Sequence, residues 1–189
     1  MQKNDNIPRE PAASAAPGFR GQLELLRCRH GRRVEQMSRR IEELISAQPD
    51  RDSFGSWLEG LKENSESIEA EIENCILTMG DMEDRVREGR LALMDEQVCT
   101  DVALAESLVL ERLTAIQRIN SAALQLVFSL KLPALIKELD KDSAALLRQA
   151  ISAQTDSVQD MSNELQDLAI ALKERNKLIT HPLDENHPE

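Results

Sequence analysis

An evenly stepped apolar seam between residues 58 and 86 is the feature that most constrains how this chain can fold. Its steps alternate between three and four residues, and eight of its nine positions are apolar, counting one cysteine. Such spacing lines one side of a long helix and turns it toward a partner helix, as in a coiled coil. The seam consists of Leu58, Leu61, Ser65, Ile68, Ile72, Cys75, Met79, Met82 and Val86. It predicts a helix over about 54–90 that packs against at least one other helix.

Three further segments have apolar residues at helical spacing, which predicts helices over about 22–47, 98–132 and 134–179. The 98–132 segment has the widest apolar face, which is typical of a helix between two or more neighbours. Its seam runs through Val98, Val102, Ala105, Val109, Arg112, Ile116, Ile119, Ala123, Leu126 and Leu130. Three Phe, one Trp and no Tyr are too few aromatics for a typical sandwich or barrel. We therefore expect an all-α fold, an elongated antiparallel bundle or coiled coil of about four helices.

The breakers in the sequence divide the chain into three parts. Residues 1–19 are rich in Pro and Ala and read as a disordered leader, residues 20–180 form the bundle, and residues 181–189 form a polar tail. Within the bundle, Gly80 and Gly89 are the only breakers between Gly60 and Pro133. One continuous helix over 54–132 is therefore an alternative to a hairpin. We favour the hairpin because the wide face of the 98–132 segment requires neighbours.

Charge is strongly segregated along the chain, whose net charge is −11. Residues 20–40 carry seven arginines and two glutamates, whereas residues 50–111 carry 17 acidic and five basic side chains. One interpretation is that the first two helices attract each other. The other is that the basic helix contacts an anionic partner through Arg27, Arg32, Arg33, Arg39 and Arg40. Nucleic acid is disfavoured as that partner, because the whole chain is acidic and lacks interleaved aromatics.

A search for chemistry predicts no catalytic, cofactor-binding or metal-ligating residues. Cys28 and His30 are two residues apart, so a helix points them to different sides. His181 and His187 lie in the predicted tail. Phosphate-binding loops, nucleophile elbows and zinc-ligand spacings do not occur. The three cysteines fit a reducing, cytoplasmic compartment, although secretion without a signal peptide remains an alternative.

Polar and flexible residues inside the seams are the candidates for helix specificity: Ser65, Met79, Met82, Arg112, Gln154 and Arg175. A polar seam residue can set register or oligomeric state. The arginines can instead reach the solvent edge or pair with acidic residues of the second helix. A buried charge without a partner is costly, so we expect Arg112 to have one. Met79 and Met82 are either core filler or part of an adaptable docking groove.

One set of residues in the second half of the chain comprises Ile116, Gln117, Asn120, Ala123, Leu124, Leu132, Pro133, Ala134, Leu135, Gln149, Gln154, Asp156 and Glu164. This set resembles the helical proteins of toxic-anion (tellurite) resistance. The resemblance implies a helical stress protein. The leader and the acidic helices are also compatible with bacterial secretion-system substrates or their helical partners.

We therefore expect a non-catalytic helical interaction or assembly module, such as an adaptor, scaffold or secretion-related subunit, whose partner is a helical protein or a second copy. The alternative is a peripheral membrane or toxic-anion-resistance-like stress protein that uses the basic helix over residues 20–40. No transmembrane segment is expected, because the most apolar stretch, residues 119–136, contains too many polar groups.

Overall fold

The structure, a computed structural model, describes residues 18–47, 51–88 and 96–180. The described residues form five helices and no strand: α1 (Phe19–Ala47), α2 (Arg51–Glu88), α3 (Glu96–Ser129), α4 (Leu132–Glu138) and α5 (Lys141–Thr180). The expected all-α fold is thus confirmed. The predicted tail and almost all of the predicted leader lie outside the described residues, although α1 already begins at Phe19.

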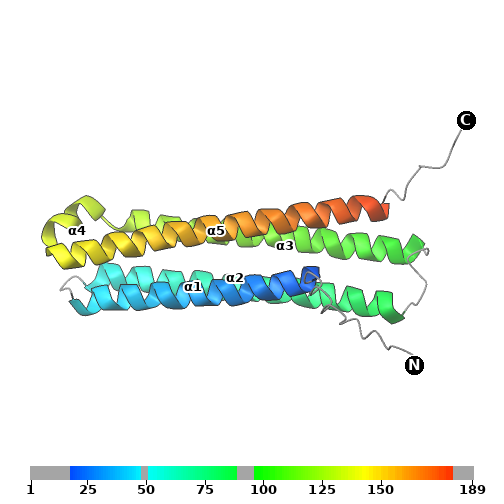
Figure 1. The fold of residues 1–189 in the computed structure, drawn as a ribbon, viewed down its shortest axis with the longest axis horizontal. Helices are drawn as coiled ribbons and strands as arrows, with labels where there is room; N and C mark the ends of the chain where they lie inside the picture. Colours follow the sequence, from blue (N-terminus) through cyan, green and yellow to red (C-terminus); the bar gives the residue numbers. More distant parts are fainter. Residues whose placement is uncertain (1–17, 48–50, 89–95, 181–189) are drawn as a thin grey trace, which may run out of the picture.

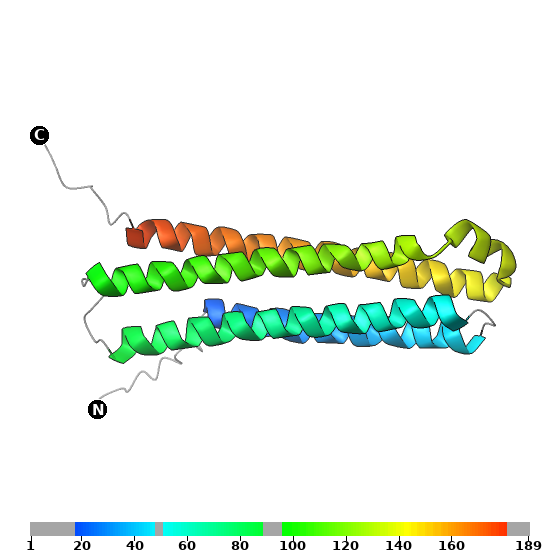
Figure 2. The same ribbon diagram turned by 180° about the vertical axis from the view of Figure 1, so that it is seen from behind.

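The four long helices lie side by side in two layers, with α1 and α2 in one layer and α3 and α5 in the other (Figure 1). Each of α1 and α3 packs against both α2 and α5. The view from behind shows the same arrangement, with the short α4 at the end of the molecule (Figure 2). The alternative of one continuous helix over 54–132 is wrong, because α2 ends at Glu88 and α3 packs against it.

The sequence predicts one helix over 134–179, whereas the structure has two, α4 and α5. Pro133 lies in the first turn of α4, where its missing N–H costs nothing. The carboxylate of Asp140 then accepts hydrogen bonds from the backbone N–H groups of Asp142 and Ser143, both at 2.9 Å. These are the bonds of a helix N-cap, so α5 begins anew after Leu139. The sequence does contain a signal for this break, Asp140 as a possible N-cap. The apolar pattern continues across it, however, and predicts an unbroken helix.

The apolar seams pack in two clusters along the bundle. One lies toward the ends joined by residues 89–95 and contains Leu23, Leu26, Ile72, Met79, Val109, Ile116, Met161 and Leu172 among others; we call it the hairpin-end core. The other lies toward α4 and contains Ile41, Leu44, Phe54, Trp57, Val127, Leu135 and Leu147 among others; we call it the α4-end core. From Leu61 to Met82, every predicted seam position of α2 is buried, as the spacing requires.

The seam predicted for α3 is displaced by one residue over much of its length. Ala105, Arg112, Ile119 and Leu126 are only half-buried, and the neighbouring residues Glu106, Leu113, Asn120 and Val127 are buried in their place. The predicted seam does not include the polar Glu106 and Asn120. In the structure, α3 packs against both α2 and α5, and both polar side chains have partners on α5. Glu106 pairs with Arg175, and Asn120 donates a hydrogen bond to the backbone oxygen of Val158.

Candidate interaction surfaces

An apolar groove between α2 and α3 is the first candidate surface. Its volume is about 260 Å³, and it is lined by Thr78, Asp81, Met82, Val86, Asp101, Val102, Leu104, Ala105 and Leu108. Leu104 is 61% exposed and Leu108 is 45% exposed, and both are large apolar side chains one helical turn apart. Leu77, next to Thr78 in α2, is 56% exposed. We call this surface the α2–α3 groove.

Asp81 and Asp101 give the α2–α3 groove an acidic rim, one aspartate from each helix. Residues 77–108, which include both walls of the groove, carry eight acidic and three basic side chains, a net charge of −5. Contiguous apolar surface with a polar rim is typical of protein-binding sites. Met82, which the sequence offered as either core filler or part of a docking groove, lines this groove together with Val86. The exposed Leu77 and Leu104 lie off the predicted seams, so the sequence pattern did not indicate them.

Behind the α2–α3 groove lies a buried carboxylate that sequence reasoning also missed. Glu106 of α3 is 0% exposed, and its Oε1 lies 2.6 Å from Nε of Arg175 on α5. Nη2 of the same arginine lies 3.8 Å from the sulfur of Met82, which lines the groove. Burial raises the pKa of the Glu106 carboxyl, and the positive charge of Arg175 opposes that rise.

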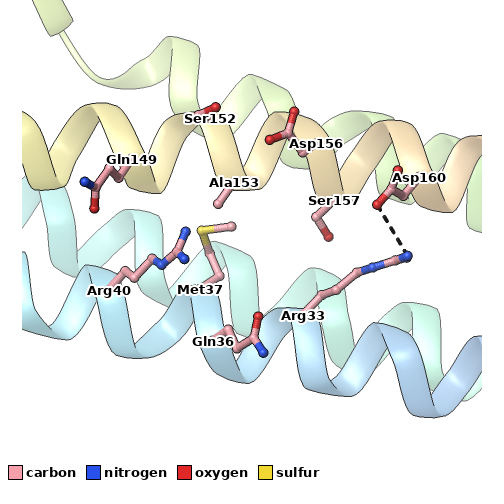
Figure 3. Close-up of a pocket in the computed structure, with 10 residues that line it drawn as sticks. All are labelled: Arg33, Gln36, Met37, Arg40, Gln149, Ser152, Ala153, Asp156, Ser157 and Asp160. Atoms are coloured by element: carbon pink, nitrogen blue, oxygen red, sulfur yellow. Dashed lines mark ion pairs between the residues drawn. The ribbon is translucent and has the colours of Figure 1, made fainter.

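A polar groove between α1 and α5 is the second candidate surface (Figure 3). Its volume is about 410 Å³, and it is lined by Arg33, Gln36, Met37, Arg40, Gln149, Ser152, Ala153, Asp156, Ser157 and Asp160. Arg33 reaches across it, with Nη2 at 2.8 Å from Glu164 and 3.5 Å from Asp160. Its two walls carry opposite charges, so the groove has no net charge to select an ionic partner.

The five arginines proposed as partner contacts do not form one free basic patch. Arg27 forms an ion pair with Glu73 of α2, and Arg33 pairs with α5. Arg39 lies 2.5 Å from Glu35 of its own helix. Arg32 and Arg40 are exposed, and neither forms an ion pair with a residue that the structure describes. Much of the basic charge of α1 therefore ties α1 to its neighbours.

The candidates for helix specificity divide into three groups. Ser65 and Gln154 are buried near the middle of the bundle, and Met79 is fully buried in the hairpin-end core. Arg112 is half-buried and has the partner expected of it, because its Nη1 lies 2.8 Å from Glu71 of α2. Arg175 and Met82 come together behind the α2–α3 groove. These placements leave their predicted roles as proposals.

Ser65 and Gln154 belong to a set of buried polar residues that separates the two cores. One residue comes from each long helix, His30, Ser65, Asn120 and Gln154, and all four line a cavity of about 30 Å³. We call this set the central polar layer. Nε2 of His30 lies 3.1 Å from the Ser65 hydroxyl, and the Gln154 side chain accepts a hydrogen bond from Trp57 at 2.8 Å. Burial lowers the pKa of His30 to about 4, and the charge of Arg33 acts in the same direction.

Other chemistry in the described residues is sparse. Burial raises the pKa of the Cys75 thiol to about 12, so this cysteine remains protonated near neutral pH. The residues with described positions contain no group of three or more His, Cys, Asp or Glu side chains arranged to hold a metal ion. No single helix among them has the length and hydropathy to cross a membrane, although residues 99–129 with α4 meet those criteria together across a 50° bend.

Comparisons with protein-family models, with curated proteins and with solved structures found no match to this chain. The resemblance to toxic-anion resistance proteins in the second half of the chain therefore has no counterpart among them. Function has to be argued from the α2–α3 groove, the α1–α5 groove and the charges described above.

Proposed function

We propose that this chain is a non-catalytic interaction module, an antiparallel bundle that docks an amphipathic helix of another protein in the α2–α3 groove. The observation that carries the proposal is the exposure of Leu104 and Leu108 beside an apolar groove of about 260 Å³. Isolated exposed leucines are common on protein surfaces, but two on one helical ridge beside an apolar groove form a patch that a partner can cover.

The shape of the groove favours a helix as the occupant. Two packed helices leave a straight trough along their length, into which a third helix can place side chains from one face. The charge of the rim favours a helix with Lys or Arg on its flanks, since the exposed Asp81 lies at the edge of the groove. A second copy of this chain is disfavoured as the occupant, because the negative segments of the two copies would repel each other.

The test uses a synthetic amphipathic helix with leucine at every third or fourth position and lysine on both flanks. Isothermal titration calorimetry with the full chain should detect binding, and Leu108→Ser should weaken it about tenfold. Leu25→Ser is the matched control, because Leu25 on α1 is also 45% exposed but lies away from the groove. A peptide with glutamate in place of lysine should bind more weakly than the lysine peptide.

Three outcomes would contradict the proposal: no binding of the lysine peptide, equal binding of the glutamate peptide, or equal losses for Leu108→Ser and Leu25→Ser. Size-exclusion chromatography with light scattering over a dilution series tests the second-copy alternative. A dimer that Leu108→Ser dissociates would replace the partner helix with another copy of the chain.

The membrane-surface alternative has one supporting observation, the exposed Arg32 and Arg40 on α1. Against it, the apolar face of α1 is already covered, since Leu26 and Ile41 are buried in the bundle. Binding of α1 to a membrane through that face would require it to leave α2 and α5. Sedimentation with phosphatidylglycerol vesicles tests this alternative: salt-sensitive binding that Arg32→Glu with Arg40→Glu abolishes would support it.

A further inference from the structure

Three residues from three helices form a chain of contacts behind the α2–α3 groove. Glu106 on α3 pairs with Arg175 on α5 at 2.6 Å, and Arg175 lies 3.8 Å from the sulfur of Met82 on α2. Met82 is only 5% exposed, yet it lines the groove, so it forms part of the groove floor. Asn176, the next residue of α5, donates a hydrogen bond to the backbone oxygen of Ala103 at 3.3 Å. The last turns of α5 are thus joined to α3, and Arg175 extends that connection to α2.

The burial of Glu106 is hard to explain by stability alone. A carboxylate with no exposed surface carries a large desolvation cost, and an apolar residue of similar volume commonly serves a core better. The second ion pair of α3, Arg112 with Glu71 of α2, is half-exposed on both sides and avoids most of that cost. The burial of Glu106 is therefore better explained by its effect on the position of Arg175 than by a contribution to stability.

The guanidinium of Arg175 is suited to fix two neighbours at once. It is planar, so the Nε that lies 2.6 Å from Glu106 and the Nη2 that lies near Met82 belong to one rigid group. In this structure Nη2 is the atom next to the Met82 sulfur. Methionine has three side-chain torsions and adapts easily, so a floor that contains it needs a fixed neighbour to keep one shape.

We propose that Glu106 and Arg175 are positioning residues for the α2–α3 groove, which hold Met82 in the conformation that a docked helix meets. This inference rests on the proposed function, because it explains how the same surface is kept ready for a partner. The ion pair acts through Met82 and does not itself contact the partner.

The decisive variant replaces both charges at once, Glu106→Leu with Arg175→Met. Glu106 is fully buried, whereas the Arg175 side chain is 41% exposed. Apolar residues at both positions remove the desolvation cost of the buried carboxylate, so this variant should fold with wild-type helicity by circular dichroism. We expect its affinity for the lysine peptide to fall about fivefold or more, because the apolar pair no longer orients Met82. The Met82 methyl resonance, observed with ¹³C-methyl methionine, should shift in the free variant.

Two further variants separate positioning from a general structural effect. Arg175→Lys keeps the charge but loses the fixed direction of Nη2, so we expect the same Met82 shift and a similar loss of affinity. Arg112→Met, at the half-exposed pair on the same helix, is the matched control and should leave both measurements near wild type.

The methyl resonance also separates this inference from the proposed function. If the wild type does not bind the peptide, the proposed function fails, while the Met82 shift still tests whether the pair sets the groove floor. An unchanged Met82 resonance and wild-type peptide affinity in both Glu106→Leu/Arg175→Met and Arg175→Lys would overturn the inference. Loss of folding in the double variant would also contradict it, because the pair would then act on stability.

Discussion

The two cores of this bundle differ in what they contain and in what surrounds them. The α4-end core includes the two largest fully buried side chains, Trp57 and Phe54. The hairpin-end core is aliphatic, lies beside the buried Glu106, and has the exposed Leu104 and Leu108 on its outer side. The central polar layer lies between them.

This difference indicates that the two ends of the bundle have different physical properties. The α4-end core buries large aromatic area and gives the helices a stable anchor. The hairpin-end core has a buried charge and two exposed leucines beside it, whereas the exposed Phe128 follows Val127 of the α4-end core. We expect the half that carries the buried charge to open more easily than the other half.

The variants with the largest expected effect on stability replace one leucine of α1 by alanine in each core. Leu44→Ala in the α4-end core and Leu26→Ala in the hairpin-end core remove side chains that are 0% and 1% exposed. Each should cost about 2–5 kcal/mol of unfolding free energy in urea denaturation. If the halves open separately, Leu26→Ala should speed amide exchange in the hairpin-end half only, whereas Leu44→Ala should speed it throughout. If both variants speed amide exchange equally throughout the chain, the bundle unfolds as one cooperative unit and its two halves do not differ in stability.

A second test uses pH at the central polar layer. The folded pKa of His30 is about 4, against an ordinary value of 6.5. Below about pH 6.5 the unfolded chain therefore binds a proton at this histidine, whereas the folded chain does so only as the pH nears 4. The contribution of neutral His30 is therefore fully present above pH 6.5 and is lost as the pH falls toward about 4. The loss should reach about 3 kcal/mol.

The control for this pH test is His30→Asn, which keeps a polar group but does not titrate in this range. The difference in unfolding free energy between wild type and His30→Asn should narrow from pH 7 to pH 4. A difference that stays constant over that range would show that His30 titrates as an exposed histidine does.

The helices themselves follow from the sequence, because long seams need only regular spacing to be recognised. The α2 seam was predicted almost position by position, and the polar Ser65 within it is buried as expected. The break at Asp140 was not predicted, since a local N-cap decided it against a continuous apolar pattern. The second helix also begins earlier than predicted, at Arg51 instead of residue 54.

The candidate site was only partly predictable, and the reason is physical. Arg175 and Met82 were identified as seam residues, but their contact depends on the packing of α5 against α3. Glu106 lies outside the predicted seam, and nothing in the sequence indicates its burial, because carboxylates are rarely buried without a partner. The burial of Glu106 is explained by its ion pair with Arg175, which lies 69 positions further along the chain on another helix.

A third test examines how firmly the central polar layer holds the two halves together. Gln154→Leu leaves the indole N–H of Trp57 without its acceptor and removes the additional side-chain hydrogen bond to the backbone oxygen of Ala123. It should cost about 1–3 kcal/mol, because the buried indole N–H then lacks a hydrogen bond. Trp57 is the only tryptophan, so its fluorescence reports on the layer directly. Gln149→Leu, at an exposed glutamine of the same helix, is the control and should change neither stability nor emission.

The smallest expected effect concerns the arginines of α1. Arg39 pairs with Glu35 on the exposed side of one helix, whereas Arg33 pairs with Glu164 across to α5. Arg39→Gln should change the unfolding free energy by less than about 0.5 kcal/mol, because exposed pairs one turn apart contribute little and are screened by salt. Arg33→Gln should cost about 1 kcal/mol, since its pair is more than three-quarters buried and joins two helices. Equal effects in urea denaturation at low salt would mean that the charge of α1 does not contribute to its attachment to α5. The basic helix would then keep its arginines for a reason other than packing, and the membrane-surface alternative would gain support.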